Sequence, residues 1–150
     1  MGQELSAMNV IGPLIGAAVF VALMSRVHEP ARRTLNAVLV AGAAGVYLSG
    51  GGFDAWELLL PIVMTPIAYH GLVSYKSIGV AWFVHSAADA VHHLWGNPIW
   101  PFAPMSSFGC LIFDAAIGVW FVMGAPSVWR SRAAAPTLDP GPSASLGTGS

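Results

Sequence analysis

The chain has 150 residues, of which 55% are hydrophobic and 9% are charged, and its formal net charge is −1. An ordinary soluble domain has roughly 25% charged residues, so this composition argues against a soluble protein. It favours a helix bundle dissolved in lipid, where Gly, Pro and interfacial Trp are common. The balanced charge excludes the basic surface that nucleic-acid binding requires, and the single Cys excludes an intrachain disulfide.

Long apolar stretches predict five transmembrane helices, because a span needs about 20 mostly apolar residues. In chain order the predicted spans cover residues 8–25, 34–49, 55–72, 78–95 and 107–125. Strands explain these stretches less well, since the stretches are long and do not alternate strictly. We therefore expect residues 1–130 to form one all-α membrane bundle and the Pro-, Gly- and Ser-rich residues 131–150 to form a disordered tail.

The positive charges predict the orientation of this bundle. All of them follow the first, third or fifth span, at Arg26, Arg32, Arg33, Lys76, Arg130 and Arg132. Because cytoplasmic loops carry the excess of Lys and Arg, we expect the N-terminus outside and the tail in the cytoplasm. The expected location is a bacterial inner membrane, which the chain would cross several times.

Ionisable residues that remain inside the predicted spans indicate a functional site. They are Glu57, His70, His85, Asp89, His92, His93 and Asp114, with no Lys or Arg among them. Such groups are costly in a span and usually face the bundle interior. Carboxylates without a cationic side chain need another positive species, which is a proton, an imidazolium or a metal ion.

The segment HSAADAVHH places four ionisable groups on one helix face. At about 100° per residue, His85, Asp89, His92 and His93 share an arc of roughly 100°. Imidazole together with carboxylate suits Zn, Fe or Mn. We therefore predict these four residues as ligands of a divalent transition metal, with a proton-linked or purely hydrogen-bonded network as the alternative.

Two carboxylates on other spans are predicted to complete this site in the outer half of the bundle. The helix directions place Asp114 level with Asp89, and Glu57 level with His92. We expect Asp114 to complete the ligand shell or to orient a ligating His, and Glu57 to act as the general base toward water. Ser107 and Cys110 lie on the same face as Asp114.

The predicted function is that of a metal-dependent membrane enzyme acting on a lipid-like or other apolar substrate. The uncharged connection GNPIWPFAPMSS would fold back above the polar stripe as a lid or would form an aromatic belt. Two alternatives remain open. The same residues would relay protons or a metal ion in a homo-oligomeric transporter, or the stripe would bind another protein's helices in an accessory or structural subunit.

The run HSAADAVHHLWGNPIWPFAPMSSFGC, followed by Asp114, Trp120-Phe121 and Gly124-Ala125-Pro126, carries a resemblance. It resembles a family of small bacterial and fungal polytopic membrane proteins of unknown function. The resemblance covers about the C-terminal third to half of the chain. It implies a membrane location, and it implies no activity, cofactor or ligand set.

Overall fold

A computed structural model of the chain describes residues 6–129. The helices are α1 (Met8–Met24), α2 (Ala31–Ala43), the 3-10 helices η1 (Val46–Ser49) and η2 (Asp54–Leu58), α3 (Leu59–Gly71), α4 (Tyr75–Trp95) and α5 (Ser106–Val122). Within the described range, β pairing is limited to an isolated bridge between Trp100 and Ala103. The prediction of an all-α chain with five helices is therefore confirmed, whereas the predicted tail at 131–150 lies outside the described residues.

None of the helices within residues 6–129 is both long enough and apolar enough to cross a membrane. The predicted number of helices is correct, but the prediction that they span a membrane is not supported by their length and hydropathy. Two of the predicted spans are divided. The second consists of α2 and η1, and the third begins as η2 before it continues as α3.

Glycines between η1 and η2 separate the second predicted span from the third. Gly50 has φ 145° and Gly52 has φ 102°. Residues other than glycine rarely adopt such backbone conformations. The chain therefore reverses direction between the two 3-10 helices.

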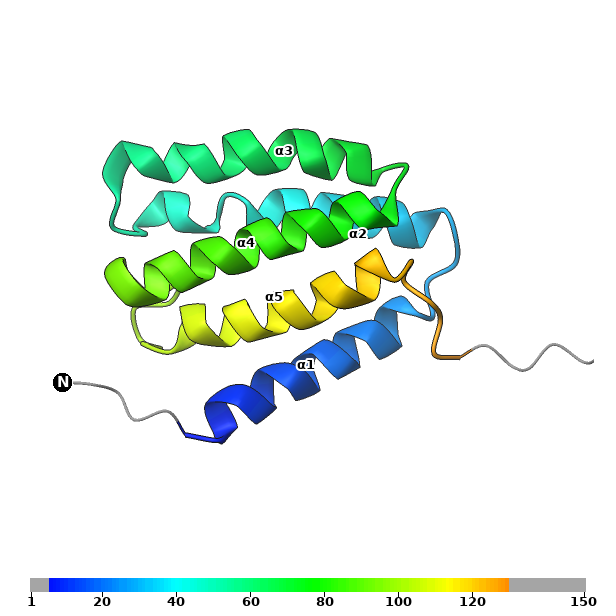
Figure 1. The fold of residues 1–150 in the computed structure, drawn as a ribbon, viewed down its shortest axis with the longest axis horizontal. Helices are drawn as coiled ribbons and strands as arrows, with labels where there is room; N and C mark the ends of the chain where they lie inside the picture. Colours follow the sequence, from blue (N-terminus) through cyan, green and yellow to red (C-terminus); the bar gives the residue numbers. More distant parts are fainter. Residues whose placement is uncertain (1–5, 130–150) are drawn as a thin grey trace, which may run out of the picture.

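The helices form a bundle in which α4 is central (Figure 1). α5 packs on one side of α4, α3 and α2 pack on the other, and α1 packs against α5. The α1–α2 and α3–α4 connections lie at the same end of the bundle as the end of α5. η2 and the α4–α5 connection lie at the opposite end, near the start of α1 (Figure 1).

A close approach of α4 and α5 fixes the register between these two helices. A Cβ atom on Gly79 would lie 2.8 Å from the carbonyl oxygen of Gly118 and 2.6 Å from Cγ2 of Val122. The helices therefore pack this closely because position 79 has no side chain. Further along, the hydroxyl of Ser86 donates to the carbonyl oxygen of Leu111 at 2.9 Å. This packing brings the polar face of α4 against α5.

Candidate functional site

A buried group of one imidazole and two carboxylates lies where α4 packs against α5. His85 and Asp89 are about one helical turn apart on α4, and Asp114 comes from α5. The Nδ1 atom of His85 lies 2.8 Å from Oδ2 of Asp114 and 3.4 Å from Oδ2 of Asp89. All three residues are buried, and Asp89 has 0% exposed surface. We call these three residues the α4–α5 centre.

The second ring nitrogen of His85 restricts where protons reside in this centre. Nε2 lies 2.9 Å from the carbonyl oxygen of Ala43, and because a carbonyl only accepts, Nε2 carries the hydrogen. Ala43 is the last residue of α2, where helix carbonyls lack an intrahelical partner. Nδ1 therefore faces the carboxylates either as a donor on a charged imidazolium or as a lone pair directed at a proton or metal ion.

The charge of the α4–α5 centre is not balanced by its own groups. An imidazolium and two carboxylates sum to a net charge of −1, and no Lys or Arg within residues 6–129 forms an ion pair with either carboxylate. Oδ2 of Asp89 is buried without a hydrogen-bond partner in the described part of the chain. Because an unpaired buried charge is very costly, the centre requires one more positive species.

Tyr47 on η1 holds the other oxygen of Asp89. Its hydroxyl donates to Oδ1 of Asp89 at 2.7 Å and lies 3.0 Å from Oγ of Ser107. Ser107 also accepts a hydrogen bond from the backbone N–H of Ile99. With Oδ1 held by Tyr47, the unpartnered Oδ2 is the oxygen that faces His85.

A second buried pair consists of Glu57 from η2 and His92 from α4. Nε2 of His92 lies 3.2 Å and 3.0 Å from the two carboxylate oxygens of Glu57, and Nδ1 donates to the carbonyl oxygen of Ala88 at 2.7 Å. The backbone N–H of Phe53 donates to Glu57 at 3.0 Å. Glu57 and His92 therefore contact each other and not the residues of the α4–α5 centre.

The ring of Tyr47 joins the two groups. It stacks on the ring of His92 with a centroid separation of 3.4 Å and an interplanar angle of 10°. One aromatic side chain therefore contacts both the Glu57–His92 pair, through its ring, and the α4–α5 centre, through its hydroxyl.

The four residues of the predicted stripe divide among different surroundings. His85 and Asp89 belong to the α4–α5 centre, and His92 belongs to the pair with Glu57. His93 is only partly buried, and its ring packs against Phe108 with centroids 5.2 Å apart. The structure thus brings Asp114 to His85 and Asp89, and Glu57 to His92, but it does not bring His92 and His93 to the group of three.

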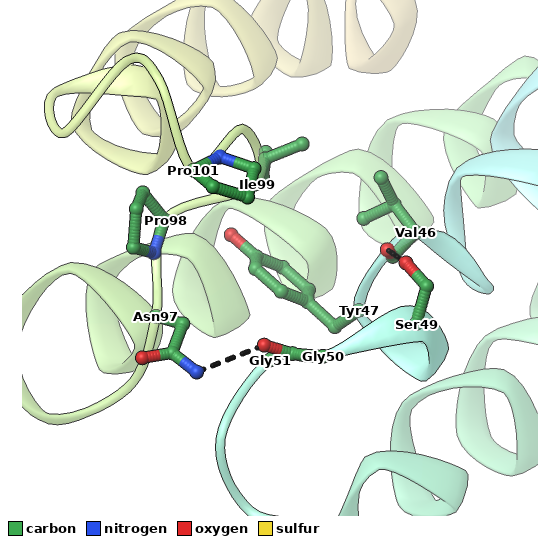
Figure 2. A pocket seen from close by; sticks show the side chains of 9 residues that line it. All are labelled: Val46, Tyr47, Ser49, Gly50, Gly51, Asn97, Pro98, Ile99 and Pro101. Atoms are coloured by element: carbon green, nitrogen blue, oxygen red, sulfur yellow. Dashed lines mark hydrogen bonds between the residues drawn. The ribbon is translucent and has the colours of Figure 1, made fainter.

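A cavity of about 440 Å³ lies beside Tyr47 (Figure 2). Its walls are the glycine-rich segment after η1 and the start of the α4–α5 connection, including Pro98, Ile99 and Pro101. Asn97 ties these walls together, since its side-chain amide donates to the carbonyl oxygen of Gly50 at 3.0 Å. Because Tyr47 both lines this cavity and contacts Asp89, its side chain lies between the cavity and the α4–α5 centre.

Sequence reasoning missed Tyr47 and the carbonyl of Ala43. Neither has a spacing signal, because both come from the second predicted span and meet α4 only in the tertiary structure. The helical spacing of Ser107 with Asp114 did place Ser107 on the correct face, and it is fully buried. Cys110, on the same predicted face, is partly buried and free.

The fold and the site define a helix bundle with a charged, histidine-containing core. The chain belongs to a family of unknown function, DUF6010, which matches residues 8–127. The match includes all five helices and every residue of both buried groups. It confirms membership of an uncharacterised family, and it does not itself show a membrane location. No curated protein and no solved structure matches the chain.

Proposed function

We propose that the chain is a membrane-embedded, metal-dependent enzyme that acts on a lipid-like or other apolar substrate. The observation that supports a bound metal ion is the unpartnered Oδ2 of Asp89, which faces Nδ1 of His85 beside Asp114. A divalent ion with one neutral imidazole and two carboxylates has zero net charge. Such an ion would therefore supply the positive charge that the centre lacks.

The positions of the ligand atoms support this proposal. One ligand atom from each of His85, Asp89 and Asp114 lies within 4.8 Å of the others. Around a tetrahedral ion with bonds of about 2.0–2.1 Å, ligand atoms lie about 3.3 Å apart, and the two distances from Nδ1 of His85 are 2.8 Å and 3.4 Å. Zn, Fe or Mn would suit these donors.

The surroundings of the centre also suit a metal ion. Metal-ligating histidines usually donate their other ring N–H to a carboxylate or a backbone carbonyl, as His85 does to Ala43. Three protein ligands leave a position for water or substrate, which is typical of catalytic sites. We assign proton exchange with the substrate to the Glu57–His92 pair, which contacts the ring of Tyr47.

The surface of the bundle supports a membrane location for this enzyme. Large apolar side chains are exposed along the helices, for example Ile15 at 58%, Ile62 at 67% and Val119 at 51%. The described basic residues are Arg26, Arg32, Arg33 and Lys76, and all belong to the end of the bundle with the α1–α2 and α3–α4 connections (Figure 1). By the positive-inside rule, this end would face the cytoplasm and the site would lie in the outer half.

The experiment that tests the metal is elemental analysis of the full chain purified in mild detergent. We expect about one equivalent of Zn, Fe or Mn, and we expect Asp89→Asn and Asp114→Asn to lose it. Asp54→Asn is the matched control, because Asp54 is exposed on η2 and Asn tolerates its φ of 50°. Less than about a tenth of an equivalent in the wild type, where a resident ion is expected to persist, would contradict the proposal.

A second candidate function is proton translocation, and one observation favours it. Asp114, His85, Asp89 and Tyr47 form a continuous series of polar contacts through the core. Proton flux in proteoliposomes that disappears in Asp89→Asn, from protein without bound metal, would favour this function over the metal enzyme.

A further inference from the structure

An apolar groove of about 330 Å³ lies between α4 and the segment formed by η2 and α3. Its walls include Trp56, Leu60 and Val63 on one side and Val84, Ala88 and Val91 on the other. Among the described residues, Glu57 and His92 are the only ionisable side chains that line it. Ligand pockets of small molecules have this size and this mixture of an apolar wall with a few polar groups.

The polarity of the groove changes along its length. Glu57 and His92 lie near the end of the bundle formed by η2 and the C-terminal turns of α4 (Figure 1). Val84 precedes His92 by eight residues on α4, which places it about 12 Å further into the bundle. A molecule with a polar group at one end and a hydrocarbon chain at the other would match this gradient.

The Glu57–His92 pair selects the polar group. His92 already uses Nδ1 on the carbonyl of Ala88 and directs Nε2 at Glu57, so it has no free donor for an anion. Glu57 is 7% exposed, and its carboxylate has acceptor positions beyond those used by Phe53 and His92. A hydroxyl can donate to Glu57, whereas a carboxylate or phosphate would be repelled by it.

We propose that this groove binds one single-chain amphiphile with an uncharged hydroxyl head, the hydroxyl at Glu57 and the alkyl chain between α3 and α4. This inference rests on the proposed function, for which it names the class of substrate. The groove residues do not include the α4–α5 centre, so binding in the groove and metal content are separate measurements.

The test uses photolabelling of the full chain in mild detergent with a dodecanol that carries a diazirine near its methyl end. Adducts mapped by mass spectrometry are expected on α3 and α4, around Val63 and Val84. Ala88→Leu places a larger side chain in the groove and should reduce labelling by about tenfold or more. Ala87→Leu is the matched control, since Ala87 is exposed on the adjacent face of α4 and does not line the groove.

Competition with unlabelled ligands tests which chemical groups the polar end and the apolar end of the groove accept. Each added methylene from octanol to dodecanol should tighten binding by about fourfold, from the free energy of burying a CH₂ group. Dodecanol should compete more strongly than dodecanoate, by about tenfold or more because a buried like charge is avoided, and Glu57→Gln should narrow this difference. Equal competition by alcohol and acid would contradict the assigned head group.

Metal analysis of the same preparations separates the two proposals. Ala88→Leu that keeps its metal but is no longer labelled supports the groove and shows that the variant is folded. The groove proposal is overturned, even if metal is present, when Ala88→Leu and Ala87→Leu are labelled equally. It is also overturned when α1 carries as many adducts as α3 and α4. If the groove is labelled as expected in protein that contains no metal, the proposal of a metal-dependent enzyme is overturned and the proposal of a binding groove is retained.

Discussion

The hydroxyl of Tyr47 donates a hydrogen bond to Oδ1 of Asp89 at 2.7 Å, across 42 residues of sequence. The same ring lies flat against His92, so one side chain orients a carboxylate of the α4–α5 centre and forms a wall of the Glu57–His92 pair. The outer contacts of metal ligands set ligand orientation and affinity. Tyr47 therefore contacts both buried groups.

Tyr47→Phe should weaken metal binding without unfolding the bundle. The variant loses the hydrogen bond to Asp89 but keeps the ring that stacks on His92. We expect metal affinity to fall by about 10–100-fold, as for other outer contacts of metal ligands, measured by competition with a chelator. Tyr69→Phe serves as the control because Tyr69 is exposed. An unchanged affinity in Tyr47→Phe would show that this hydrogen bond does not position a ligand.

If the proposed metal ion is bound, its removal should lower the thermal stability of the wild-type protein. A ligand that binds only the folded state adds about 2.7 kcal/mol to the free energy of unfolding at 100 times its Kd. Adding EDTA should therefore lower the unfolding temperature of the wild type, measured in mild detergent. Asp114→Asn should respond little, because it lacks a ligand of the centre. The same response in both proteins would mean that the stabilising ion lies elsewhere.

Gly51→Ala should separate Glu57 from His92. A Cβ at this position would lie 2.2 Å from Oε1 of Glu57 and 2.7 Å from Nε2 of His92. Relieving this overlap should cost about 1–3 kcal/mol in the free energy of unfolding, measured by denaturant titration. Gly42→Ala is the control, because its Cβ would meet nothing within 4 Å inside α2, and it should be neutral or stabilise by up to about 1 kcal/mol.

Glu29 should make stability depend on pH at the basic end of the bundle. It accepts hydrogen bonds from Tyr75 and from Arg32, the latter at 2.8 Å. Burial alone would raise the pKa of Glu29, but these hydrogen bonds and the positive charges of Arg32 and Arg33 together hold the pKa below its ordinary value of 4.5. A lowered pKa in the folded state stabilises the protein above the ordinary value and loses this effect as pH falls through the folded value.

The corresponding measurement compares unfolding temperatures of the wild type and Glu29→Gln. The wild type should be the more stable protein at neutral pH, and the difference should shrink once the pH falls below the folded pKa of Glu29. Asp54→Asn, at the opposite end of the bundle, controls for the loss of a carboxylate. A difference that is the same at neutral and acidic pH would indicate that Glu29 acts through packing and not through its charge.

The helical periodicity of α4 is enough to predict part of the site. The spacing of His85 and Asp89 places them on one face, and the helix directions place Asp114 level with Asp89. The same reasoning places Glu57 level with His92. It does not predict that His92 and His93 stay apart from His85 and Asp89, because an arc of about 100° is wide enough for its members to face different helices.

The amino-acid sequence is enough to predict that this chain is all-α, that it has five helices, and that its buried carboxylates have few cationic side chains to pair with. Composition and helical period are local properties of the sequence, so they can be recognised without knowledge of the tertiary structure. The contacts of Ala43 and Tyr47 with the α4–α5 centre, and the separate pairing of Glu57 with His92, follow from the folded arrangement of the helices. These contacts depend on where α2 ends and on how closely Gly79 lets α4 approach α5, and packing between helices fixes both.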